Sequence, residues 1–378
     1  MSEKQKPLIS LEKVARLLHV DKLGEHVEFT PKNGFYEVTF REPRNYQLKD
    51  GKIGKNLSLR DSDGSVTYGY FKSRASFNSR FKLTKRHGNH YGEYLASIIL
   101  KQLDIPACRV DIGVYPFRHP YKQGAIIPVE GSLSHYQLKQ ADIFIPLSVI
   151  AQRYKSSNKK HYNALIGETY KPGASSSTAH YTNIEIILAS IQSFLASENQ
   201  ESKINKVRQQ IFDMCLFDLK FANRDRHDDN FGLKVNQDTG EINFYELFDN
   251  EQILGMQLQE TLAQDALDNP KRFEDLKRRD FTSYIGYPGK PTATVPTELF
   301  SYLLQKYPKE TIKAYKKVSR YSLEDLKKTM EVCLPDMPDA HRNLACKLFE
   351  DREREMAQVL EDYYRATGPI DENTLDEC

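Results

Sequence analysis

A buried helix that ends abruptly in polar and charged residues constrains this chain more than any other feature. Residues 204–222 have helical periodicity, and the side chains between Ile211 and Phe221 are almost all apolar, so we expect this helix to lie in the core. The next eight residues, 223–230, read Asn-Arg-Asp-Arg-His-Asp-Asp-Asn. A solvated loop would account for this composition when it is taken alone.

The residues that follow favour a reactive site over a plain loop. Residues 231–235 and 241–248 have the pattern of two strands, and Asn236–Gly240 joins them with a turn signal. A hairpin returns the chain antiparallel to itself. We therefore expect Asn230, at its entry, and Asp249, at its exit, to be neighbours.

Asp225 lies five residues before Asn230 on the same loop, so the hairpin gathers two carboxylates and a carboxamide. Oxygen ligands of this kind suit Mg²⁺, which usually shares its coordination with substrate phosphates. A carboxylate beside the metal, such as Asp225, can orient an attacking hydroxyl and accept its proton. This layout indicates phosphoryl transfer, with Asn230 and Asp249 as metal ligands.

Phosphoryl transfer also needs a cation on the phosphates, and the N-terminal third offers Lys72. This lysine ends the predicted strand 66–72, and Glu93 opens the predicted helix 92–103. In kinase folds a strand lysine holds the nucleotide phosphates and a helix glutamate holds that lysine. A solvated lysine and a glutamate favoured by the helix dipole are the alternatives for each residue alone.

The sequence contains neither GxGxxG nor GxxxxGK[ST], so a phosphate loop would be of another kind. The nearest candidate is Asp50–Lys55, whose glycines would let backbone N–H groups approach phosphate and whose Lys55 would add charge. A plain turn is the alternative.

Composition excludes several other classes of protein. Lys and Arg number 54 against 52 Asp and Glu among 378 residues, so the formal charge of +2 gives no footprint for bulk nucleic-acid or membrane binding. The longest apolar runs are too short for a transmembrane helix. The N-terminus has no apolar signal region, and five widely spaced cysteines predict neither a disulfide framework nor a zinc cluster. We expect a cytoplasmic protein.

The pattern along the chain predicts an α+β fold with a strand-rich N-terminal part and a helical remainder. We expect an N-terminal extension over 1–45, a strand-rich lobe over 46–147 and a helical lobe over 148–378 that carries the loop 223–230. A loop-rich insertion is expected over 154–180, because Ser, Lys and Tyr dominate there. The helices predicted from periodicity beyond it are 183–197, 204–222, 296–306, 309–319, 323–333 and 340–365.

On these residues the chain resembles the HipA-like kinases, including the CtkA type, which are bacterial serine/threonine kinases distantly related to phosphatidylinositol kinases. The loop 223–232 matches the family segment N-x-D-R-H-x-x-N, and Phe248-Asp249 falls where the family has its metal aspartate. Gly92–Ala96 resembles the helix that carries the family's glutamate, and Phe71-Lys72 resembles its strand lysine.

The resemblance implies a bilobal protein-kinase-like fold that uses ATP and Mg²⁺. By the same match Asp225 would be the catalytic base, and Asn230 and Asp249 would hold magnesium. Lys72 and Glu93 would bind the nucleotide, together with Lys55 of the candidate phosphate loop. Asp249 is followed by Asn250 and not by the remainder of a DFG motif, so regulation by a flipping DFG is not expected.

Three functions stay open on the sequence. The first is an autophosphorylating serine/threonine protein kinase, acting as a toxin or as a delivered effector, whose protein partner would be an antitoxin or a host protein. The second is a lipid or small-molecule phosphotransferase, and the third is a nucleotide-binding pseudokinase. Retention of Asp225, Asn230 and Asp249 speaks against the third. We expect no direct contact with nucleic acid or membrane.

Two further segments, 227–229 and 268–291, have predictions of their own. His227 is expected to position the loop through hydrogen bonds to backbone, with Asp228 and Asp229 solvated or supporting the metal ligands indirectly. Residues 268–291 carry several Lys and Arg side chains, and either a solvated loop or a docking segment for an acidic partner would explain them.

Overall fold

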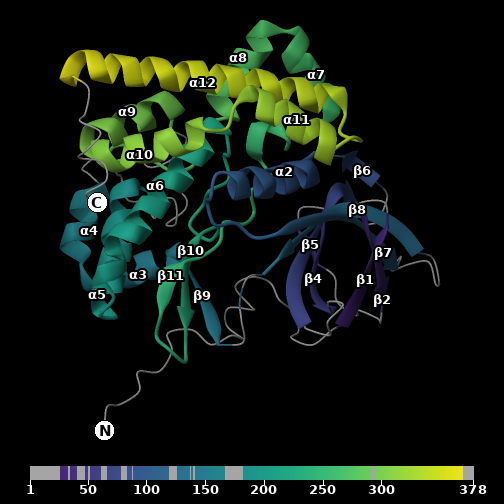
Figure 1. Ribbon diagram of the computed structural model, residues 1–378, viewed down its shortest axis with the longest axis horizontal. Coiled ribbons are helices and arrows are strands. Elements are labelled where there is room, and N and C mark those ends of the chain that lie inside the picture. The colour runs from purple at the N-terminus through teal and green to yellow at the C-terminus, as the bar shows by residue number, and fades with distance from the viewer. Residues whose placement is uncertain are drawn as a thin grey trace.

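The computed structural model has two unequal parts. The part built on the large sheet lies on the right of Figure 1, and the helical part lies on the left and along the top. It describes residues 69–73, 88–112, 131–136, 138, 141–166, 182–290 and 294–368 in full, and the backbones of the remaining strand residues. The strands are β1 (His26–Lys32), β2 (Phe35–Phe40), β3 (Gln47–Lys49), β4 (Lys52–Arg60), β5 (Val66–Phe77), β6 (Leu83–Arg86), β7 (Val110–Arg118), β8 (Ile126–His135), β9 (Asp142–Pro146), β10 (Gly232–Asn236) and β11 (Ile242–Phe244). The helices are α2 (Asn89–Gln102), α3 (Leu147–Ser157), α4 (Lys159–Ile166), α5 (Ile184–Ser197), α6 (Ile204–Lys220), α7 (Glu260–Asp268), α8 (Pro270–Arg279), α9 (Pro296–Lys306), α10 (Pro308–Ser319), α11 (Leu323–Cys333) and α12 (Asp339–Thr367).

The N-terminal part is built on an eight-stranded sheet in the order β3-β4-β1-β2-β7-β8-β5-β6. β4 also pairs with β5 in antiparallel register, so the six strands from β4 to β5 in this order close into a ring. Closure leaves these strands without free edges. β1 and β2 lie within the segment 1–45, and they pair with β4 and β7 of the same sheet.

Helix α2 connects this sheet to the rest of the molecule. In Figure 1 it lies between the sheet and the C-terminal helices. Leu95 and Ile99 belong to the same buried cluster as the apolar side chains of α6, so α2 packs into the core of the helical part. The chain leaves α2 through Ala107, which forms a parallel bridge with Leu247.

A small sheet at the border of the two parts holds the predicted hairpin. β10 pairs with β11 and, on its other side, with β9. The second strand is shorter than the predicted 241–248, because Leu247 leaves β10 and bonds instead to Pro106 and Cys108. This change of partner draws the end of the hairpin toward α2.

Helices make up the remainder, and most predicted boundaries agree with the structure within a few residues. Ser322 and Asp325 form a reciprocal capping box at the start of α11. The loop predicted over 154–180 is wrong for residues 154–166, where the end of α3 and the whole of α4 are helical and bury Tyr154 and Tyr162. The rest of that segment lies outside the described residues. Within the described part, no helix is long and apolar enough to cross a membrane.

Candidate active site

The loop from 223 to 230 begins where α6 ends, and a buried ion pair fixes it there. Arg226 is 1% exposed, and its Nε and Nη2 atoms donate to Asp218 at 2.9 and 3.1 Å. Its Nη1 donates to the backbone oxygens of Asn230 and Phe248, both at 3.2 Å, and Nη2 also bonds the side chain of Asn250. One guanidinium therefore ties the helix, the loop and the end of the hairpin together.

Asp225 lies at the centre of this loop, and Gln252, a residue after the hairpin, bonds its carboxylate. Its Oδ2 accepts a hydrogen bond from Gln252 Nε2 at 2.7 Å, and its backbone oxygen accepts one from the Asn230 side chain at 2.7 Å. Burial, followed by the negative charges of Asp249 and Glu251, raises the pKa of Asp225 to about 7. A carboxylate with such a pKa is suited to accept a proton near neutrality.

Asp249 follows the hairpin and turns toward the N-terminal part. Its φ of 56° is left-handed, a region that aspartate enters more readily than most residues. Its carboxylate forms an ion pair with Lys72 of β5, which is 177 positions away in sequence. The sequence-predicted lysine and metal aspartate are thus in direct contact.

Lys72 has a second acidic partner that sequence reasoning missed. Its Nζ lies 3.6 Å from Oε2 of Glu251, a residue that is 5% exposed. Burial alone would lower the pKa of Lys72, but the charges of Asp249, Glu251 and Glu93 raise it well above its ordinary value. The position of Glu251, two residues after Asp249 in the sequence, was the signal available for it.

Glu93 lies nearby but makes no ion pair with Lys72. It is 2% exposed; its Oε1 is 3.4 Å from the Ser134 hydroxyl, and its Oε2 has no hydrogen-bond partner. Burial, followed by the charge of Asp249, raises the pKa of Glu93 to about 8. Burial and the charge of Asp249 therefore favour the protonated form of the Glu93 carboxyl group.

Helix α2 packs closely against the segment that carries Asp249 and Glu251, because Gly92 has no side chain. A Cβ atom on Gly92 would lie 2.4 Å from the backbone oxygen of Glu251 and 3.0 Å from the Cβ of Met256. Real Cβ atoms essentially never show the first of these distances. Glycine at 92 thus permits α2, and Glu93 with it, to lie directly on the segment that carries Asp249 and Glu251.

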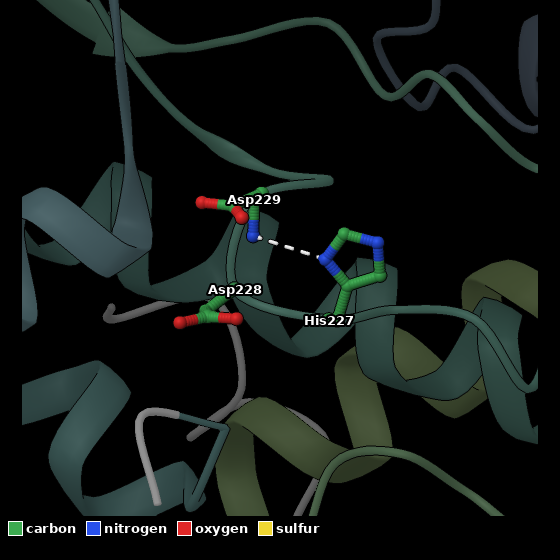
Figure 2. Close-up of side chains that lie close together, drawn as sticks. All are labelled: His227, Asp228 and Asp229. Atoms are coloured by element: carbon green, nitrogen blue, oxygen red, sulfur yellow. Dashed lines mark hydrogen bonds between the residues drawn. The ribbon is translucent and has the colours of Figure 1, made fainter. Parts of the chain in front are cut away.

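His227, Asp228 and Asp229 form a second polar cluster on the same loop (Figure 2). The Nδ1 atom of His227 accepts a hydrogen bond from the Asp229 backbone amide at 3.3 Å, which confirms its predicted role in positioning the loop. Asp229 is exposed and accepts a hydrogen bond from the Ser148 hydroxyl. Asp228 is buried and not solvated, and its Oδ2 has no hydrogen-bond partner among the described residues. Ligand atoms of the three residues lie within 4.8 Å of one another, and we assign no ion to them.

The predicted phosphate loop lies only partly within the described residues. Lys55 belongs to β4, where it pairs with Phe71, and Gly54 pairs with Lys72. The side chain of Lys55 lies outside the described residues, so its role stays a prediction. The segment 268–291, for which a loop was considered, instead contains the whole of α8.

The fold is that of known kinases. The proinflammatory kinase CtkA of Helicobacter pylori superposes with a TM-score of 0.59 at 16% sequence identity, over 89% of this chain and 96% of that one. The HipA toxin of Shewanella oneidensis MR-1, solved with HipB and operator DNA, aligns with a TM-score of 0.44 at 10% identity, over 93% of this chain and 70% of that one. No protein-family model matches the sequence, and no curated protein matches it. The first similarity confirms the predicted bilobal, kinase-like α+β fold and the resemblance to the CtkA type at the level of fold.

Proposed function

We propose that this chain is an ATP- and Mg²⁺-dependent serine/threonine protein kinase. The observation that carries the proposal is the convergence of Lys72, Asp249 and Asp225 where the two parts of the molecule meet. Lys72 and Asp249 form an ion pair, and the charge of Asp249 in turn raises the pKa of Asp225. These are the three chemical groups that phosphoryl transfer requires: a cation for phosphates, a metal ligand and a base.

The residues at the site fit a magnesium ion. The charges of Asp249 and Glu251 act on both Glu93 and Asp225, and Lys72 forms ion pairs with Asp249 and Glu251. The guanidinium of Arg226 is already committed to Asp218. Burial, followed by the negative charges of Asp249 and Glu251, raises the pKa values of Asp225 and Glu93, and a divalent cation at the site would lower both. Asp249 and Asn230 are the ligands we assign to it.

In this proposal each residue has one task. Lys72 binds the nucleotide phosphates, and a magnesium ion held by Asp249 and Asn230 would supply positive charge to offset the charge that develops on them. Asp225 orients the acceptor hydroxyl and takes its proton as the oxygen forms a bond to the γ-phosphorus. The bond from that phosphorus to the bridging oxygen breaks, and ADP leaves with the electron pair. Lys55 is proposed as a further cation for the phosphates.

The acceptor is proposed to be a protein, including this chain itself. CtkA is a proinflammatory kinase, and this likeness supports a host protein as a candidate partner, with an antitoxin as the other candidate. We propose action in the cytoplasm, or in a host cell after delivery, without nucleic acid or membrane as a direct partner.

Nucleotide binding and acceptor choice test this proposal separately. Titration with ATP and Mg²⁺ should show binding by the wild type and roughly 100-fold weaker binding by Asp249→Asn, which removes a metal ligand. Transfer is then measured to the chain itself, to a mixed protein acceptor such as casein, and to phosphatidylinositol vesicles. Transfer to lipid alone would replace the protein-kinase proposal with a lipid kinase, and ATP binding without transfer to any of these acceptors would leave a nucleotide-binding pseudokinase.

A further inference from the structure

Lys72 has two acidic partners, and only one of them remains when a metal is bound. Its ammonium group contacts Asp249 directly and lies 3.6 Å from Glu251. The proposed function commits Asp249 to magnesium. Because a lysine that carries phosphates must be held in place, a second carboxylate has to keep Lys72 in position.

Glu93 does not fill that place in this structure. In the described part of the chain no ion pair joins Glu93 to Lys72, although both side chains are described. One Glu93 oxygen faces the Ser134 hydroxyl at 3.4 Å, and the other is buried without a hydrogen-bond partner. The residue at the predicted position is therefore present but not engaged.

Glu251, in contrast, is fixed with its carboxylate near the lysine. Its side chain is 7% exposed, and its backbone oxygen packs against Gly92 so closely that a Cβ atom there would lie 2.4 Å away. The neighbouring Asn250 is bonded by Arg226, whose guanidinium is itself anchored on Asp218. Both sides of this short segment are thus held by buried contacts, so Glu251 does not depend on a ligand for its position.

We propose that Glu251, rather than Glu93, is the positioning residue that holds Lys72 on the nucleotide phosphates. The inference rests on the proposed function, which supplies the nucleotide and the metal. It assigns to the segment after the hairpin a task that a helix glutamate performs in other kinase folds. The same short segment would then supply both a metal ligand, Asp249, and the anchor of the phosphate-binding lysine.

A double-mutant cycle tests the inference through binding rather than turnover. Calorimetric titration with a non-hydrolysable ATP analogue and Mg²⁺ gives Kd for the wild type and for Glu251→Gln, Glu93→Gln, Lys72→Met and Lys72→Met/Glu251→Gln. Loss of a charge-assisted contact should raise Kd about tenfold or more for Glu251→Gln. Glu93→Gln, which changes the competing glutamate, should stay within about threefold, and a tenfold rise in Kd for this variant would overturn the inference. In the Lys72→Met background, Glu251→Gln should change Kd no further.

A purely structural role would weaken binding in both backgrounds, and a role as metal ligand would do the same, so either result would overturn the inference. Equal Kd values for Glu251→Gln and the wild type would also overturn it while leaving the proposed function intact. A wild-type protein that binds no nucleotide would overturn the proposed function and this inference together. Glu251→Asp keeps the charge and covers the case in which Glu251→Gln does not fold; it should bind more tightly than Lys72→Met.

Discussion

Arg226 and Asp218 form a two-pronged ion pair that is almost completely removed from water. The Nε–Oδ2 and Nη2–Oδ1 distances are 2.9 and 3.1 Å, and the two side chains are 1% and 2% exposed. Asp218 belongs to the apolar helix α6, whereas Arg226 belongs to the loop that carries Asp225. The pair therefore holds the loop that carries Asp225 against the buried helix α6.

Removal of one charge from this pair should be costly. Asp218→Asn leaves the buried guanidinium without its counter-charge, and we expect the free energy of unfolding to fall by about 3 kcal/mol. Urea denaturation measures this loss. The control is Glu361→Gln, which breaks an exposed pair with Arg365 and should cost less than about 0.5 kcal/mol. Equal stability of Asp218→Asn and the wild type would contradict the structural role of the pair.

The contact at Gly92 makes a prediction in which two effects oppose each other. Alanine would favour the helix by about 1 kcal/mol, but its Cβ would collide with the backbone oxygen of Glu251. Overpacking of a rigid contact costs about 1–3 kcal/mol, so we expect Gly92→Ala to destabilise the protein and to weaken nucleotide binding. Thermal unfolding and titration with Mg²⁺ and ATP are the measurements. Lys101→Ala, at an exposed position of the same helix, should change neither, and a stabilised Gly92→Ala would show that α2 is free to move.

Glu93 makes stability depend on pH. Its pKa is raised to about 8 in the folded protein, against an ordinary value of 4.5. The folded state therefore binds the proton more tightly, and this contribution to stability is lost as pH rises through 8. Glu93→Gln imitates the protonated form and avoids the loss that begins where the unfolded-state carboxyl ionises near 4.5, so its melting temperature should lie close to that of the wild type at pH 4.5 and exceed it at pH 9. The same difference at both pH values would contradict the assignment.

Asp225 makes activity depend on pH in a defined direction. A base must be unprotonated, so with a pKa of about 7 we expect kcat/KM to fall as pH is lowered through 7. The charge of Arg224 lowers the pKa of Asp225, and Arg224→Gln should therefore shift the inflection to higher pH. The pH–rate profiles of the two proteins provide the test. A wild-type profile that is flat down to pH 5.5 would be incompatible with Asp225 as the base.

The helical part could be predicted largely from the sequence, because its apolar periodicity is strong and its helix ends carry local signals. The range 323–333 and its Ser322–Asp325 cap agree with the structure. The segment 154–166 was misread because polar side chains dominate its composition, although Leu147, Ile150, Ala151 and Tyr154 bury one face of α3. A helix that buries only one narrow apolar face is difficult to recognise in a segment of mostly polar residues.

The site could be predicted in part from the sequence, and there is a physical reason why some of its contacts could be predicted and others could not. Asp225, Asn230 and Asp249 are linked by a loop and a hairpin, so their proximity follows from local structure. The partner of Lys72 depends on packing between segments far apart in the chain, and no local pattern distinguishes Glu93 from Glu251. The 3.6 Å approach of Lys72 to Glu251 distinguishes the two glutamates, and it is visible only in three dimensions.

Phosphate transfer by the wild type and by Asp225→Asn tests the central claim most directly. Both proteins are incubated with γ-labelled ATP and Mg²⁺, and the incorporated phosphate is measured by label and by intact mass; Asp229→Asn, a change on the exposed side of the same loop, serves as the control. Loss of the base should slow transfer by roughly 10²–10⁴-fold while folding and nucleotide binding persist. We predict added phosphate on the wild type and on Asp229→Asn, and none within the same time on Asp225→Asn. Transfer by Asp225→Asn at the wild-type rate would contradict the account.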